Sequence, residues 1–291
     1  MKRTLYLIFK KIFKPLFGTS ISRIPGVLAI FKFFFPLFSP QWVYVQDSKI
    51  NMDRYDPVSI YAMASNIYGP FMTKLFKRIV KKDNVVVDLG AHIGYYTLLA
   101  SRLVGENGIV YAFEPDPKTY SLLLKNIQLN QYRNINAIQK AISNNVGTAK
   151  LYLSPGRSEN TLYHINEGGS SIDVGVDTLD HYFQDTNKTI SVIKMDIEGG
   201  EMSALLGMER ILRENIDMTI FLEFIPDFIR RAGFAPQDLL YKLFSYKFKI
   251  YLIDDKEKRL RYSNNPDDII SSCKRLGIVD LVAMKRQFRN Q

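Results

Sequence analysis

Apolar and polar positions follow two different periods between residues 83 and 286 of this 291-residue chain. Runs rich in β-branched residues predict buried strands, and apolar positions three or four residues apart predict helices between them. The strand patterns lie at 85–89, 109–113, 136–142, 147–154, 190–197, 218–224, 248–253 and 278–284, and the helical patterns at 95–104, 118–130, 201–213 and 226–245. This alternation predicts an α/β domain, with helices on both faces of a mostly parallel sheet.

The first 50 residues form a basic, apolar arm that differs from the rest of the chain. Seven of the 39 basic residues precede the first acidic residue, Asp47, so the remaining 32 bases nearly balance the 29 acids. Apolar positions recur at helical spacing with lysines between them. This pattern favours either an amphipathic segment of residues 1–40 on the inner face of a membrane or a helical hairpin packed on the body. Residues 51–82 are expected to form a helical lead-in, residues 83–286 the main domain and residues 287–291 a tail.

The charge distribution and the single cysteine argue against a nucleic-acid-binding protein and against a disulfide-stabilised one. Because the basic residues gather in one apolar-rich arm and not across the body, we expect no nucleic-acid partner. The single cysteine, Cys273, excludes an intramolecular disulfide and suits a cytoplasmic location. We place Cys273 in a surface region. The longest polar loop is predicted at 154–172, and long loops in compact domains are often functional.

Small or acidic residues follow five of the predicted strands. In an open α/β sheet, ligands bind beyond the carboxyl ends of the strands. The residues found at these ends are Asp88, Glu114, Ala141, Asp196 and Glu223. We therefore expect a ligand site at this edge of the sheet.

The segment VVVDLGAHIGYYT, residues 85–97, joins the first strand to a helix through two glycines. Glu114 ends the neighbouring strand, where a carboxylate accepts hydrogen bonds from the hydroxyls of a ribose. A dinucleotide would need a G-x-G-x-x-G turn facing its pyrophosphate, and Asp88 would repel that group. The acid instead favours a positively charged sulfur, so the sequence predicts S-adenosylmethionine as the cofactor. The carboxylate of its methionine would face the helix that begins at Gly94.

Four segments together resemble the FkbM family of methyltransferases: VVVDLGAHIGYYT, YAFEPDP, GVDTLDHYF and VIKMDIEGGE. The resemblance implies a Rossmann-like class I methyltransferase fold, with a seven-stranded, mostly parallel sheet whose last strand is antiparallel. It also implies O-methylation of sugars in glycans, glycolipids or secondary metabolites. The chain departs from the family pattern after Glu223, where FIPDF carries no histidine. The residues expected at the cofactor are Asp88, Gly90, Ala91, Gly94, Tyr95, Glu114, Pro115, Ala141 and Asp196.

Three carboxylates, Asp196, Glu198 and Glu223, are the candidate catalytic residues. A sugar hydroxyl is a poor nucleophile while it is protonated, so Asp196 or Glu198 would act as a general base. Alternatively, the carboxylates hold a divalent cation through oxygen ligands. In a third interpretation, Glu201 caps a helix, Lys194 pairs with a neighbouring acid, and the site contacts only the cofactor.

Two further functions compete with an O-methyltransferase that acts on a carbohydrate or glycolipid acceptor. A nicotinamide-dependent oxidoreductase uses a similar sheet. A protein that retains the fold without catalysis would act as a scaffold at a membrane surface. Binding of the methyl donor separates the first function from the other two.

Overall fold

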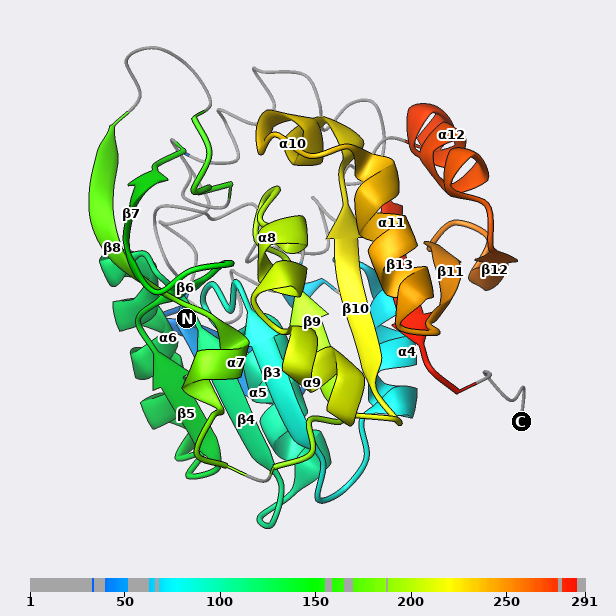
Figure 1. Ribbon diagram of the computed structural model, residues 1–291. Helices are drawn as coiled ribbons and strands as arrows, with labels where there is room; N and C mark the ends of the chain where they lie inside the picture. Colours follow the sequence, from blue (N-terminus) through cyan, green and yellow to red (C-terminus); the bar gives the residue numbers. More distant parts are fainter. Residues whose placement is uncertain are drawn as a thin grey trace.

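An eight-stranded sheet runs through the centre of the protein, in the order β12–β11–β13–β10–β9–β3–β4–β5 (Figure 1). The structure is a computed structural model that describes residues 33, 40–51, 63–65, 68–154, 159–164, 170–186, 188–276 and 279–286. The strands of the sheet are β3 (Val85–Leu89), β4 (Ile109–Phe113), β5 (Ile135–Ile138), β9 (Val192–Met195), β10 (Thr219–Phe224), β11 (Lys249–Asp254), β12 (Arg259–Ser263) and β13 (Val279–Met284).

The sheet has the seven predicted strands, with the last one antiparallel, and one strand more. Strands β5, β4, β3, β9 and β10 pair in parallel, whereas β13 pairs antiparallel with both β10 and β11. The additional strand, β12, pairs antiparallel with β11 at one edge. Its sequence, RLRYS, has a single aliphatic side chain, so no apolar run marks it as a strand.

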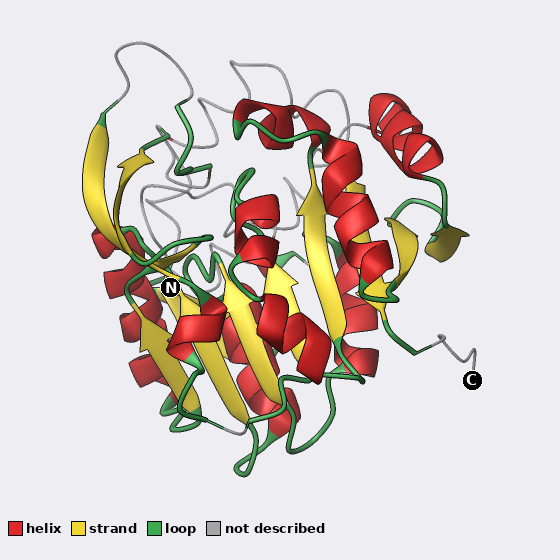
Figure 2. Ribbon diagram, in the orientation of Figure 1, coloured by secondary structure: helices red, strands yellow, loops and turns green. Residues whose placement is uncertain are grey.

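Helices cover both faces of the sheet (Figure 2). Adjacent residues of β3 point to opposite faces: Val86 packs in the core with α4 and α5, and Val87 in the core with α8, α9 and α11. Both side chains are fully buried, and each such burial stabilises the fold by about 1.5–3 kcal/mol. The helices are α4 (Pro70–Ile79), α5 (Tyr95–Val104), α6 (Pro117–Asn130), α7 (Leu179–Tyr182), α8 (Glu201–Leu206), α9 (Glu209–Glu214), α10 (Pro226–Arg231), α11 (Pro236–Ser245) and α12 (Pro266–Leu276).

The single helix predicted at 201–213 is divided into α8 and α9. Helix α8 ends at Leu206, and the N–H of its C-cap residue, Gly207, donates to the carbonyl oxygen of Ser203. The Asp180 carboxylate of α7 then accepts the N–H groups of Arg210 and Ile211, at 2.7 and 3.0 Å. These N–H groups lie in the first turn of α9 and have no acceptor within that helix. The contact with α7 therefore stabilises the start of a second helix.

A separate three-stranded sheet, in the order β6–β8–β7, stands beyond the carboxyl ends of β4 and β5 (Figure 1). Its strands are β6 (Ala141–Ile142), β7 (Gly147–Tyr152) and β8 (Ser171–Asp177). The strand predicted at 136–142 is therefore two elements, because β5 pairs with β4 whereas β6 pairs with β8. The pattern SIDVGVD of β8 follows a polar loop and mixes acids with valines, and it was not predicted as a strand.

A hairpin of β1 (Trp42–Val45) and β2 (Ser48–Asn51) packs against α6. The N–H groups of Lys49 and Asn51 donate to the side-chain oxygens of Asn130 and Asn126, at 2.7 Å in both cases. The last part of the predicted arm is therefore attached to the body. The amphipathic pattern at 1–40, apart from residues 33 and 40, lies outside the described residues, as does the tail at 287–291. In the part of the chain that is described, no helix is long and apolar enough to cross a membrane.

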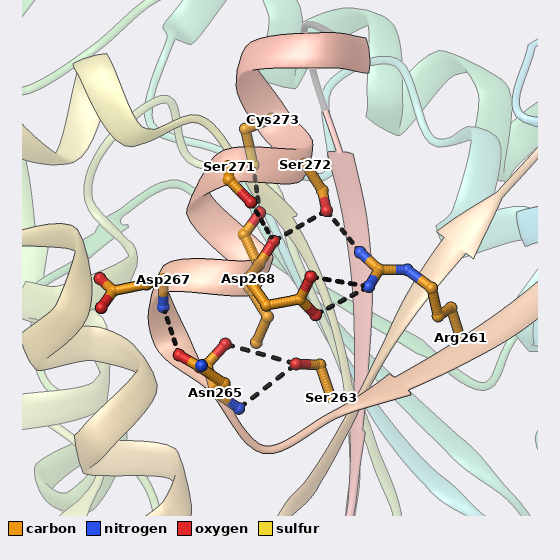
Figure 3. Close-up of polar contacts among 9 residues, drawn as sticks. Arg261, Ser263, Asn265, Asp267, Asp268, Ser271, Ser272 and Cys273 are labelled. Carbon is orange, nitrogen blue, oxygen red and sulfur yellow. Dashed lines mark hydrogen bonds and ion pairs between the residues drawn. The ribbon is translucent and has the colours of Figure 1, made fainter.

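Helix α12 carries Cys273 into the core, so the predicted surface position is wrong. The apolar face of α12 buries this thiol together with Ile269 and Ile270. Burial raises the pKa of the Cys273 thiol to about 11, which leaves it protonated and unreactive at neutral pH. On the polar side of α12, the Arg261 guanidinium of β12 donates twice to the Asp268 carboxylate, at 2.9 and 2.7 Å (Figure 3).

Candidate functional site

The turn between β3 and α5 brings separate backbone segments into contact. Gly90 has a φ of +77°, and a Cβ there would lie 1.8 Å from the carbonyl oxygen of Asp196. The N–H groups of Gly90 and Ala91 both donate to the carbonyl oxygen of Phe113, at 3.0 Å. Gly94, with a φ of +99°, is the N-cap residue of α5. Only glycine fits at position 90, and this close approach brings together the ends of β3, β4 and β9.

The Glu114 carboxylate is fixed by two backbone hydrogen bonds. It accepts the N–H of His92 at 2.9 Å and the N–H of Asp116 at 3.0 Å, one on each oxygen. The backbone of His92 thus takes part in the site through its N–H. Burial raises the pKa of the Glu114 carboxyl to about 8, although both hydrogen bonds act in the opposite direction. In the ionised form, each oxygen keeps a lone pair for a further donor.

Asp88 is buried at the end of β3, where it accepts the Thr97 hydroxyl at 2.5 Å. Burial raises the pKa of the Asp88 carboxyl to about 6, against the effects of Thr97 and of the nearby Lys194. Its pKa therefore stays low enough for the carboxyl to be largely ionised at neutral pH. Negative charge is thus held at the start of the turn, as the sequence predicts.

A cavity of about 320 Å³ opens at the carboxyl ends of β3, β4, β9 and β10. The predicted cofactor residues that line it are Asp88, Gly90, Ala91, Tyr95, Glu114, Pro115, Ala141 and Asp196. Gly94 is not among the lining residues and contributes only to the turn that begins α5. The three candidate catalytic carboxylates line the same cavity. The sequence patterns do not single out Tyr68, Lys140 and Phe228, which also line it and come from outside the large sheet.

The carboxylates of Asp196, Glu198 and Glu223 form a cluster in which their oxygens lie within 4.8 Å of one another. Burial, followed by repulsion from Asp196 and Glu201, raises the pKa of the Glu198 carboxyl to about 9. Burial, followed by repulsion from Asp196 and Glu198, raises the pKa of the Glu223 carboxyl to about 10. Without a ligand, Glu198 and Glu223 therefore hold protons at neutral pH.

Lys194 is the basic partner of this cluster. Its ammonium lies 3.0 Å from a carboxylate oxygen of Asp196 and 5.3 Å from the centre of the Tyr96 ring. Burial alone would lower the pKa of Lys194, but the carboxylates of Asp196 and Asp280 raise it overall. Lys194 therefore remains charged and fixes the direction of the Asp196 side chain. This is the pairing that the third interpretation of the sequence expects.

Glu198 and Glu201 have different roles in the loop after β9. Glu198 has a φ of +52°, a conformation that costs a residue with a Cβ about 1–2 kcal/mol. The Thr161 hydroxyl donates to the Glu198 carbonyl at 2.7 Å and supports this conformation. Glu201 accepts the N–H groups of Ile197 and Gly199, both at 3.3 Å, at the start of α8. Glu201 thus holds the loop, while the Glu198 side chain reaches the cavity.

The residues present fit a cationic nucleoside better than a pyrophosphate. Among the described residues, six carboxyl groups and two lysines line the cavity: Asp88, Glu114, Glu159, Asp196, Glu198 and Glu223, with Lys140 and Lys194. A pyrophosphate would keep Glu114, Glu198 and Glu223 protonated and would still face the charges of Asp88 and Asp196, whereas a sulfonium is attracted by those charges and favours ionisation of the other acids. The three clustered carboxylates also offer the oxygen donors that a divalent cation prefers.

Comparisons with known proteins agree with these features. A sequence model of the methyltransferase FkbM domain matches residues 88–250. Methyltransferase 1 of Beauveria bassiana is 26% identical over an aligned stretch of 148 residues, and the match covers 44% of this chain and 59% of that protein. Methyltransferase sdnD of Sordaria araneosa is 29% identical over an aligned stretch of 156 residues, and the match covers 43% of this chain and 60% of that protein. The chain therefore spans about three-fifths of the length of these two relatives.

One solved structure that matches this chain is a putative rRNA-methylase from Clostridium thermocellum. It superposes with a TM-score of 0.46 and 13% sequence identity, covering 75% of this chain and 95% of the other. A methyltransferase from Aquifex aeolicus, described as SAM-dependent, superposes with a TM-score of 0.42 and 14% identity, covering 75% and 90%.

Proposed function

The chain belongs to the FkbM methyltransferase family, and on this premise we propose that it transfers a methyl group from S-adenosylmethionine to a hydroxyl oxygen of a saccharide. The saccharide would belong to a glycan, a glycolipid or a related metabolite. One observation carries the proposal: the clustered carboxylates of Asp196, Glu198 and Glu223 line the same cavity as Glu114. Groups suited to hold the donor and groups suited to take a proton thus share one cavity. Family membership also favours methyl transfer over the nicotinamide-dependent alternative.

Residues at two adjacent strand ends would hold the donor. Glu114, with one backbone N–H on each oxygen, keeps a lone pair on each for the ribose hydroxyls. Asp88 adds negative charge at the turn, and the N-terminus of α5 favours a carboxylate. When bound, S-adenosylmethionine supplies an electrophilic methyl group on a positively charged sulfur.

Glu198 is the carboxylate that best suits the role of general base. One oxygen of Asp196 is already paired with Lys194, whereas the Glu198 carboxylate accepts no hydrogen bond within the described part of the chain. Positive charge brought into the cavity lowers the raised pKa of Glu198, so its proton can leave. The ionised Glu198 oxygen would then take the proton of the acceptor hydroxyl as that oxygen receives the methyl group, and the donor, its bond from sulfur to the methyl carbon broken, would leave as a neutral thioether. Asp196 is the alternative base.

The same carboxylate cluster supports a second way to activate the acceptor. Three carboxylate oxygens within 4.8 Å are suitable ligands for a divalent cation. In that arrangement, Asp196, Glu198 and Glu223 would orient the acceptor oxygen through the cation and would not take its proton directly. Methyl transfer by protein treated with EDTA, with and without added Mg²⁺, distinguishes the two arrangements. Full activity after chelation supports the base.

A lipid-linked acceptor would explain the basic, apolar segment at 1–40. Lysines and arginines there suit an anionic membrane surface, while the apolar residues between them suit the lipid boundary. We therefore propose peripheral contact with the inner face of a membrane. Deletion of residues 1–40 should move the protein from the membrane fraction to the supernatant. An unchanged distribution would contradict this contact and leave the methyltransferase proposal intact.

Calorimetry with S-adenosylmethionine and with NAD tests the proposed donor. We expect binding of the first and none of the second, with loss of binding in the Glu114→Ala variant. Radiolabelled methyl transfer to lipid and polysaccharide extracts of the source cell then tests the acceptor. Tight NAD binding without S-adenosylmethionine binding would reverse the proposal, and binding of neither would favour a scaffold.

A further inference from the structure

A second, smaller cavity adjoins the first. It has a volume of about 50 Å³ and is lined by Glu159, Thr161, Tyr163, Glu198, Phe228 and Arg231. Glu159, Glu198 and Phe228 line both cavities. The two spaces therefore meet at Glu198, the residue assigned above as the base. The smaller cavity lies between the described loop 159–164 and α10, which stands beyond the carboxyl ends of β9 and β10 (Figure 1).

Some polar groups of the smaller cavity are already engaged and form its wall. The Thr161 hydroxyl donates to the Glu198 carbonyl at 2.7 Å, and the Tyr163 hydroxyl lies 2.7 Å from the Ser203 hydroxyl oxygen. Asn160, next to Glu159, donates to the Asp116 carboxylate at 3.2 Å. These bonds tie the loop both to the end of β4 and to the loop after β9. The wall is therefore held in place by groups that also position the larger cavity.

Glu159 and Arg231, of opposite charge, line the smaller cavity without pairing with each other. Within the described residues, neither forms an ion pair, and the Arg231 guanidinium only stacks on the Phe228 ring, 5.1 Å from its centre. The neighbouring Arg230 behaves differently, because it pairs with Asp227 at 2.7 Å. Glu159 and Arg231 are thus available to a ligand, one as an acceptor and the other as a donor.

Two neighbouring hydroxyl groups satisfy these side chains. One donates its proton to the Glu159 carboxylate, and the oxygen of the other accepts an N–H of Arg231. An anionic substituent would be attracted by Arg231 but repelled by Glu159. A cationic substituent would be attracted by Glu159 but repelled by Arg231. The Phe228 ring adds an apolar face for the C–H groups of a sugar. A cavity of about 50 Å³ has room for about three to five water-sized groups, which suits two neighbouring hydroxyls at the edge of a ring.

We infer that the smaller cavity is the acceptor subsite and that Glu159 and Arg231 select neutral saccharides through a pair of neighbouring hydroxyls. This inference rests on the proposed function, because the saccharide would present a third hydroxyl to Glu198 in the larger cavity. Glu159 and Arg231 are then specificity-determining residues. The acceptor would reach the methyl donor from the side of α10 and of the loop 159–164.

Binding of sugar probes to the protein saturated with S-adenosylhomocysteine tests the inference. The neutral probes are the methyl α-glycosides of glucose, galactose, mannose and rhamnose, and the charged probes are glucuronic acid and glucosamine. We expect at least one neutral probe to bind by saturation-transfer NMR at least tenfold more tightly than either charged probe. The Glu159→Gln and Arg231→Gln variants should each bind that probe at least tenfold more weakly. Arg230→Gln, the matched control, should bind it as the parent does.

The variants should also change the selectivity in opposite directions. Without the acid, Glu159→Gln should gain affinity for glucuronic acid, whereas Arg231→Gln should gain affinity for glucosamine. If either residue had only a structural role, its variant would show no such gain of affinity for the sugar that carries the same charge as the residue removed. The inference is overturned if no neutral probe binds, if a charged probe binds the parent equally well, or if Arg230→Gln loses as much affinity as Arg231→Gln. Calorimetric binding of S-adenosylhomocysteine in the same samples shows whether the donor site, and with it the proposed function, still stands.

Discussion

Exchange of Glu114 for glutamine is the most direct test of the donor site. The two side chains are nearly equal in size, but the amide keeps one accepting oxygen where the carboxylate has two. In the parent, each oxygen already accepts one backbone N–H and has one lone pair left. The amide nitrogen cannot accept, so the variant would lose one of the two backbone hydrogen bonds and, at the same atom, a charge-assisted hydrogen bond to one ribose hydroxyl; the latter alone is worth about 1.5–3 kcal/mol. At about 1.4 kcal/mol for each factor of ten, the dissociation constant should rise about 10- to 150-fold.

The pH of the assay decides how large this difference is. Because burial raises the pKa of the Glu114 carboxyl to about 8, the parent has its full advantage only above that pH. Titration calorimetry with S-adenosylmethionine at pH 8.5 should show the whole difference, and at pH 6.5 the two proteins should bind more similarly. Glu106→Gln, at an exposed position outside the cavity, is the control. A folded Glu114→Gln protein that binds within twofold of the parent at pH 8.5 would refute the reasoning.

Three further predictions concern the base, the buried acids and the glycine turn. Glu198→Gln should lower kcat by about 10²- to 10⁴-fold while the donor affinity stays within threefold, and a normal kcat would reassign the base to Asp196 or to a cation. Because burial raises the folded-state pKa of the Glu198 and Glu223 carboxyls to about 9 and about 10, the folded protein binds more protons than the unfolded one. Its free energy of unfolding without ligand should therefore fall as the pH rises from 5 to 9 in denaturant titrations, and a flat profile would contradict the buried acids. Gly90→Ala should prevent folding, since its Cβ would lie 1.8 Å from a carbonyl oxygen, whereas Gly175→Ala, with its nearest contact at 3.6 Å, should fold normally by circular dichroism.

Strong local patterns made the centre of the fold predictable. The runs at 85–89 and 109–113 match β3 and β4 residue for residue, and the helical pattern at 95–104 matches α5. These segments are buried, so their apolar period is set by the core. β12 and β8 escaped prediction because their pairing with neighbouring strands, and not an apolar run, makes them strands. Cys273 was misplaced because the polar residues of DDIISS suggested a surface segment, whereas Ile269 and Ile270 of the same segment pack in the core beside the thiol.

The residues of the candidate site that stand at the ends of strands could be predicted from the sequence. Those that loops and helices contribute could not. Asp88, Glu114 and Asp196 stand at ends of parallel strands, and such ends meet at one edge of a sheet. Tyr68 and Arg231 come from segments whose place over that edge depends on tertiary packing. No local pattern carries that information.

The position of β12 at the rim of the large sheet also affects how the protein behaves at high concentration. A rim strand exposes backbone N–H and C=O groups that pair readily with a strand from another molecule, the first step towards aggregation. Two of the five residues of β12 are arginines, and Arg259 is exposed to solvent. Positive charge at this place makes stacking of one molecule on another unfavourable, and it does so at a strand that contributes nothing to the cavity. Because Arg261 is paired with Asp268, the exposed Arg259 guanidinium is the group that disfavours the addition of a partner strand at this edge.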